Sequence, residues 1–168
     1  MNTIERANDL IIDYEAKFVQ SGLDKELLLR ESFILWYILV EGIKCENFSE
    51  DELKRLLMRN VGNYQRIYID DPDLNFIIGW MVGIAFWYFA PLIKEEDGLR
   101  LLDRAYKSNP KNSLFKWAIR NELKLKDREV ELLKTDIALR YDQFNNHGTL
   151  IKQYFLDILT TSPTGRGL

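Results

Sequence analysis

Twenty consecutive residues, from Leu74 to Ile93 (LNFIIGWMVGIAFWYFAPLI), carry no charged side chain. A helix that is apolar on every side must be buried on every side, in protein or in lipid. The stretch therefore predicts either a central core helix or a membrane span. Because the rest of the chain is amphipathic, we expect it to be arranged around this segment.

Length alone permits a membrane span, because twenty helical residues rise about 30 Å, close to the thickness of a bilayer core. Acidic residues flank the stretch on both sides: Asp70, Asp71 and Asp73 before it, and Glu95, Glu96 and Asp97 after it. An oriented span would instead show an excess of Lys/Arg on one side. Pro91 also disfavours helical geometry at Ala90. We therefore expect a buried core helix, in which Gly79 and Gly83 allow another helix to approach closely.

The remaining apolar residues recur at helical spacing, and turn signals separate them into segments. Asp24 is a predicted N-cap, and Ser49 with Glu52 forms a predicted capping box. Residues 61–73 fit either a short helix or an extended piece. Asp71-Pro72 is expected to start the central helix, with proline tolerated in the first turn. Helices are expected at about 3–20, 24–44, 49–60, 72–90, 95–107, 114–124, 126–144 and 149–159.

These segments predict an all-α fold of about seven or eight helices around the apolar central helix. A chain of 168 residues falls within the single-domain range, and we expect one helical domain over residues 1–160 and a tail over 161–168. Cys45 is the only cysteine, which excludes an internal disulfide framework and suits a reducing compartment. The N-terminal residues lack a secretory pattern, so a cytoplasmic location is expected.

The charge is unevenly distributed along the chain. Residues 1–99 hold 10 Lys/Arg against 18 Asp/Glu, whereas residues 100–168 hold 13 against 8. The acidic larger part argues against nucleic-acid binding as the main role. An acidic face suits a basic protein partner, because complementary fields speed encounter and exclude wrong partners. The alternative is a solvated surface without a partner.

The sequence contains no pattern typical of an enzyme. No phosphate-binding glycine loop, dinucleotide fingerprint, zinc-protease helix or nucleophile elbow occurs. His147 lies in an Asn-Asn-His-Gly turn and is expected to be solvated, and Cys45 is expected to be packed or idle. We therefore expect no enzyme activity, no cofactor and no metal site.

The features left for function are acidic and aromatic. Tyr64 and Tyr68 lie close in sequence to three aspartates, and tyrosine beside acid is a plausible anchor for a basic partner. The alternative is that both tyrosines fill the core. The predicted partner-binding residues are Tyr64, Tyr68, Asp70, Asp71 and Asp73, supported by Glu50 and Asp51.

The region from Trp80 to Trp117 resembles one tetratricopeptide helix pair. Trp80, Gly83 and Trp87 would lie on its first helix, and Ala105 and Tyr106 on its second. Pro110-Lys111-Asn112 looks like the turn before the next repeat. No second copy occurs at a fixed period, so the resemblance implies a repeat-like helical hairpin only. It leaves open an adaptor or scaffold that binds a protein or peptide.

The whole chain resembles the small, acidic, all-helical immunity proteins that neutralise bacterial contact-dependent growth inhibition toxins. The most similar part is NDLIIDYEAKFVQSGLDKELLLRESFILWYILVEGI together with the aromatic central segment. The resemblance implies a cytoplasmic protein that binds the toxin's C-terminal domain, often a nuclease, and occludes its active site. The expected partner is then a basic toxin domain, and binding is stoichiometric.

Overall fold

The apolar segment forms a short helix at the centre of the molecule. The computed structural model describes residues 3–144 and 147–161, and in it α4 spans Pro72–Ala85. Asp71 caps this helix, because its side chain accepts hydrogen bonds from the backbone N–H groups of Asp73 and Leu74, both at 3.0 Å. Proline at the first helical position needs no donor there, so the predicted start of the central helix is confirmed.

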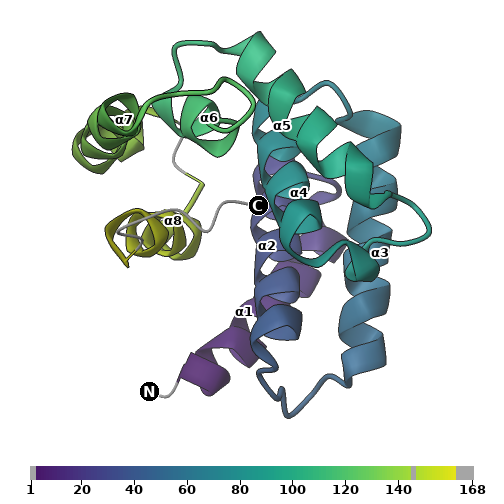
Figure 1. Cartoon of the computed structure of the whole chain (residues 1–168). Coiled ribbons are helices and arrows are strands. Elements are labelled where there is room, and N and C mark those ends of the chain that lie inside the picture. Colours follow the sequence, from purple (N-terminus) through teal and green to yellow (C-terminus); the bar gives the residue numbers. More distant parts are fainter. Residues whose placement is uncertain (1–2, 145–146, 162–168) are drawn as a thin grey trace.

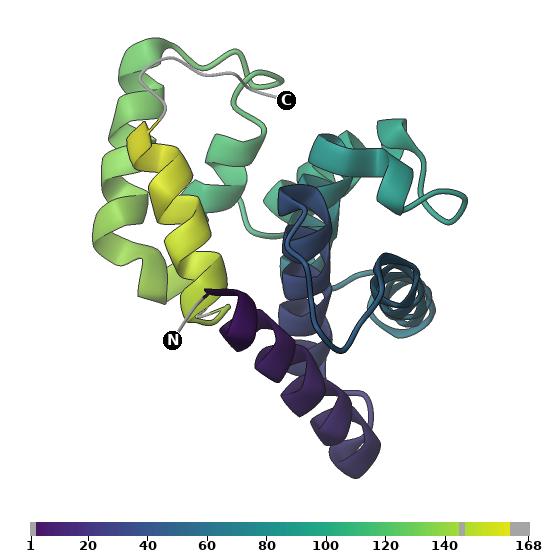
Figure 2. The same ribbon diagram turned by 90° about the horizontal axis from the view of Figure 1, so that it is seen from below.

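Helices surround α4 on all sides, as the all-α prediction requires. Figure 1 shows α2, α3 and α5 running alongside α4, with α6, α7 and α8 on the other side, and Figure 2 shows the same arrangement from below. The described residues contain helices and turns but no strand. The other helices are α1 (Thr3–Ser21), α2 (Lys25–Glu41), α3 (Glu50–Ile67), α5 (Glu95–Ser108), α6 (Ser113–Ala118), α7 (Asp127–Arg140) and α8 (Thr149–Thr161), and the two 3-10 turns are η1 (Phe86–Tyr88) and η2 (Tyr141–Phe144).

Aromatic rings join α4 to the C-terminal helices. The ring centroid of Phe76 lies 5.0 Å from that of Phe115 in α6 and 5.2 Å from that of Phe155 in α8. One turn later, Trp80 stacks on Trp117 at 5.4 Å. Such pairs contribute beyond their buried area, so α4 serves as the shared core of the single domain.

The contact between α4 and α5 depends on glycine. A Cβ atom on Gly79 would lie 2.8 Å from the carbonyl oxygen of Gly98, and one on Gly98 would lie 3.1 Å from the backbone nitrogen of Gly83. The two helices run antiparallel, so that Arg104, near the end of α5, donates to the carbonyl of Ile69, just before α4. The predicted close approach at Gly79 and Gly83 is confirmed. The two helices form a hairpin, although Trp87 lies beyond the end of α4.

The predicted end of the central helix is wrong. The α-helix stops at Ala85, and Phe86–Tyr88 form one 3-10 turn. Pro91 lies six residues beyond Ala85, so proline alone does not set the end of the helix. The chain instead turns so that Phe89 and Ile93 enter the core while Phe86, Trp87 and Leu92 remain exposed.

Three further boundaries differ from the sequence-based expectation. The ambiguous segment after Asn60 continues α3 to Ile67. The second helix ends at Glu41 because Gly42, at φ +63°, caps it in the left-handed region and donates to the carbonyl of Ile38. The expected helix over 114–124 ends at Ala118 and continues as turns. The capping box at Ser49 and Glu52 and the cap at Asp24 are confirmed.

Among the described residues, none of the helices combines the length and apolar character needed to cross a bilayer. The last helix reaches Thr161, and the rest of the predicted tail lies outside the described residues.

Replacing Gly79 with alanine is expected to destabilise the protein by about 1–3 kcal/mol, because the new Cβ would press on the backbone of α5. Gly62→Ala is the matched control, since nothing lies within 4 Å of a Cβ at that position. Alanine in a helix interior should stabilise α3 there by about 0.5–1 kcal/mol. Urea unfolding followed by circular dichroism measures both. A destabilisation of equal size in the two variants would contradict the close-packing account.

Candidate functional site

A pocket of about 500 Å³ lies where α2 ends and α3 begins. Its wall is largely apolar, with two charged residues among those that line it. The lining residues are Ile38, Leu39, Gly42, Ile43, Lys44, Cys45, Phe48, Glu50, Leu53 and Tyr88. A concave apolar surface with few polar groups is typical of binding sites.

The 3-10 turn after α4 closes one side of this pocket. The hydroxyl of Tyr88 donates to the backbone carbonyl of Leu39 at 3.0 Å, which ties the turn to α2. The ammonium group of Lys54 lies 5.9 Å from the centre of the Tyr88 ring and pairs with Glu50. Contacts from both α2 and α3 therefore hold Tyr88 in place.

The rest of the turn is directed to solvent. Trp87 is 59% exposed, whereas Trp36, Trp80 and Trp117 are buried. Its ring centroid lies 5.7 Å from that of Phe86 and 5.8 Å from that of Tyr88. We call Phe86, Trp87 and Tyr88 the aromatic turn. An exposed tryptophan beside a pocket is unusual, because burying such a ring in the core contributes strongly to stability.

Acidic residues lie in and beside the segment that lines the pocket, and Glu50 is itself one of the lining residues. Glu41 ends α2, Glu46 lies in the connection to α3, and Glu50 and Asp51 begin α3; all four are exposed. Lys44 and Lys54 are the nearby bases within residues 41–54. Burial raises the pKa of the Cys45 thiol, which leaves less of it as the nucleophilic thiolate.

The predicted partner-binding residues do not form one surface. Glu50 and Asp51 begin α3, whereas Asp70 follows its end, and 18 helical residues rise about 27 Å. Tyr64 is 1% exposed, and its hydroxyl donates to the Asn75 side chain at 2.5 Å inside the core. Burial raises its pKa. The alternative interpretation of Tyr64 as a core residue is therefore correct.

The aspartates of the predicted set have mostly structural partners. Asp71 caps α4 and pairs with Lys25 at 2.9 Å. Asp73 is buried and also pairs with Lys25, at 3.1 Å. Burial raises the pKa of Asp73, but His147 and Lys25 lower it further, so that it lies below its ordinary value. Tyr68 is half-buried and donates to the carbonyl of Leu23. Asp70 is therefore the one exposed residue of the predicted set between Tyr64 and Asp73.

The expectation for His147 is wrong, because its side chain is 1% exposed. Its Nε2 lies 3.6 Å from a carboxylate oxygen of Asp73, and its ring meets Tyr141 edge-on at a centroid distance of 6.5 Å. The imidazole therefore joins the start of α8 to the start of α4. The polar residues around it in the sequence gave no sign of burial.

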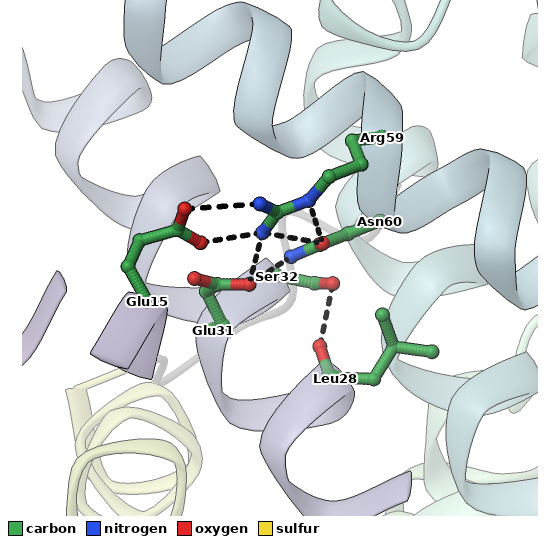
Figure 3. A network of polar contacts seen from close by, with 6 residues as sticks. All are labelled: Glu15, Leu28, Glu31, Ser32, Arg59 and Asn60. Carbon is green, nitrogen blue, oxygen red and sulfur yellow. Dashed lines mark hydrogen bonds and ion pairs between the residues drawn. The ribbon is translucent and has the colours of Figure 1, made fainter. Parts of the chain in front are cut away.

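A partly buried polar network connects α1, α2 and α3 (Figure 3). Arg59 donates two hydrogen bonds to Glu15, at 3.0 and 2.6 Å, and one to Glu31 at 2.9 Å. Asn60 donates to the same oxygen of Glu31 at 2.7 Å. Glu31 is fully buried, and its second carboxylate oxygen has no hydrogen-bond partner.

The guanidinium of Arg59 contacts the carboxyl groups of both Glu15 and Glu31, and the pKa values of these two groups shift in opposite directions. Hydrogen bonding to Arg59 lowers the pKa of Glu15. Burial, together with the neighbouring Glu15, raises the pKa of Glu31 to about 7. A shifted carboxyl group is often catalytic. Here, however, the fully buried side chain joins α2 to Arg59 and Asn60 of α3, so we assign it a structural role.

Metal-ligating side chains do not cluster: in the described ranges 3–144 and 147–161, no three His, Cys, Asp or Glu residues could together hold an ion. Comparison of the chain with family models, with curated proteins and with solved structures gives no match. The geometry alone therefore selects the candidate site. It comprises the pocket, the aromatic turn and the four acidic residues Glu41, Glu46, Glu50 and Asp51.

Glu31→Gln is expected to become stabilising relative to the natural chain as pH rises. Because the pKa of Glu31 is about 7 in the folded protein and ordinarily 4.5, the folded state binds more protons between these values. The contribution of Glu31 to the free energy of unfolding is therefore lost as the pH rises through 7. The loss is on the order of 1–3 kcal/mol. Glutamine keeps both acceptor contacts without the charge.

Urea unfolding at pH 5 and pH 8 measures this difference. The matched control is Glu26→Gln on the same helix, where the side chain is 47% exposed; it should change stability by less than about 0.5 kcal/mol at either pH. An equal effect of Glu31→Gln at both pH values would contradict the raised pKa of Glu31.

Proposed function

We propose that this chain is an immunity protein that binds a cognate bacterial toxin domain and neutralises it by stoichiometric occlusion. The observation that carries the proposal is the exposed aromatic turn beside an apolar pocket and acidic side chains. The loose resemblance of the whole chain to immunity proteins of contact-dependent inhibition systems supports it. In this proposal the protein acts by binding in the cytoplasm and performs no reaction.

The aromatic turn supplies the anchor that such binding needs. Tryptophan and tyrosine are enriched among the residues that dominate binding energy, particularly where a pocket lies beside them. Tyr88 is held by its hydrogen bond to Leu39 and Trp87 packs against it, so little side-chain freedom is lost when a partner covers the turn. An apolar side chain of the partner would fill the pocket.

The acidic side chains define the charge of the partner. Glu41, Glu46, Glu50 and Asp51 are exposed between the end of α2 and the start of α3, so a surface rich in Lys and Arg would approach fastest and in the correct orientation. Nucleases that bind an acidic backbone carry such surfaces. A basic nuclease domain is therefore the toxin class that fits this site.

A second candidate function is an adaptor that binds a protein or peptide. The antiparallel hairpin of α4 and α5 favours it, because stacked helical pairs form peptide-binding surfaces in repeat proteins. The expected partner would then bind along the hairpin and not at the pocket.

Trp87→Ala is expected to weaken toxin binding by at least about 2 kcal/mol, or roughly thirtyfold, without loss of stability, because the ring is exposed. Val19→Ala is the matched control, since Val19 is 85% exposed on α1 and distant in the fold from the pocket. Calorimetry with the toxin domain encoded immediately upstream, and growth rescue in cells that express that domain, give the two readouts.

Rescue and a one-to-one complex with the natural chain, both weakened in Trp87→Ala alone, would support the proposal. No rescue and no complex would reject the immunity function. Tight binding that is unchanged by Trp87→Ala would keep that function but reject this site.

A further inference from the structure

A second charged segment lies in the C-terminal part of the chain. Five bases follow one another on α6, on the turns after it and at the start of α7: Lys116, Arg120, Lys124, Lys126 and Arg128. We call them the basic turn. Glu122 and Asp127 are the only acids between its first and last members. Lys124, Lys126 and Arg128 are exposed, and the other two bases are half-buried.

The bases of the basic turn outnumber the acids beside them: residues 116–129 hold five bases and three acids, Glu122, Asp127 and Glu129. Within the part of the chain that the structure describes, none of its five members forms an ion pair. Elsewhere on α7, by contrast, Lys134 pairs with Glu131, and Arg140 pairs with Asp136. The positive field of the basic turn therefore extends into solvent and is available to an external anion.

The backbone under these side chains is tightly turned. Leu125 donates to the carbonyl of Arg120, and Lys124 donates to that of Asn121, both at 3.0 Å, with Lys124 at φ +52°. The guanidinium of Arg120 lies 4.5 Å from the centre of the Trp117 ring and donates to the Trp117 carbonyl at 3.0 Å. Arg120 is thus held in one orientation, with further donors left for an anion.

The chemistry of the surface distinguishes between anionic partners. A protein partner requires an apolar core in the interface, but no large apolar side chain between Lys116 and Arg128 is exposed; the nearest is Leu132, one turn farther along α7. Contacts to a phosphodiester backbone need only cations and hydrogen-bond donors.

We propose that the basic turn binds the phosphate backbone of a nucleic acid without reading its sequence. This binding would be local to the basic turn. The net charge of the whole chain does not indicate it, because the larger N-terminal part is acidic. The inference goes beyond the proposed toxin binding and does not depend on it, because the pocket and the basic turn share no residue.

The test uses the full-length chain and a fluorescein-labelled DNA duplex of about 20 base pairs, with anisotropy measured from about 50 to 200 mM salt. With three to five phosphate contacts, affinity should fall on the order of 100-fold over this range. The triple variant Lys124→Glu, Lys126→Glu, Arg128→Glu should bind at least about tenfold more weakly at the lowest salt concentration, with a shallower salt dependence.

The matched control reverses three exposed bases elsewhere, Arg55, Arg66 and Lys94, and so changes the net charge equally. It should retain most of the binding. Absence of binding at the lowest salt concentration, or equal losses in the two triple variants, would overturn the proposal. Tighter binding of a poly-glutamate peptide than of the duplex would also overturn it, because the partner would then be an acidic protein.

Discussion

The backbones of α4 and α5 touch at Gly79 and Gly98, closer than any side chain would permit. This contact fixes the position of α5 over one face of α4, and the remaining faces then accept α2, α3, α6 and α8. Aromatic rings on α4 extend the same core to the C-terminal helices through Phe76 and Trp80. Most of the helical arrangement therefore depends on α4, which is apolar on every face and has a glycine where α5 approaches it.

The same apolar stretch supplies the candidate site. Because α4 ends at Ala85, the aromatic residues after it are divided between the core, which takes Phe89, and the surface, which takes Phe86 and Trp87. The hydrogen bond from Tyr88 to Leu39 fixes the aromatic turn beside the pocket. In our proposal, an apolar anchor and acidic neighbours then bind a basic toxin domain, while a separate cationic turn binds phosphate.

Periodicity predicted the number and order of the helices. Local chemistry predicted the caps at Asp24 and Ser49, the start of the central helix at Asp71-Pro72 and the close approach at Gly79. These features depend on residues near one another in sequence. The burial of Tyr64, Asp73 and His147 could not be predicted in this way, because their partners Asn75, Lys25 and Asp73 are brought close only by the fold. Pro91 signalled that the central helix must end, but neither the break at Ala85 nor the exposure of Trp87 follows from it.

The central claim is that the apolar stretch is divided between a buried helix, α4, and an exposed turn that carries Trp87. Acrylamide quenching of tryptophan fluorescence tests this claim most directly. Of four tryptophans, only Trp87 is exposed. We expect one readily quenched component in the natural chain, about a quarter of the tryptophans, and its loss in Trp87→Phe. Equal quenching of the natural chain and the variant would show that Trp87 is buried with the others, and would contradict both the fold at this turn and the site built on it.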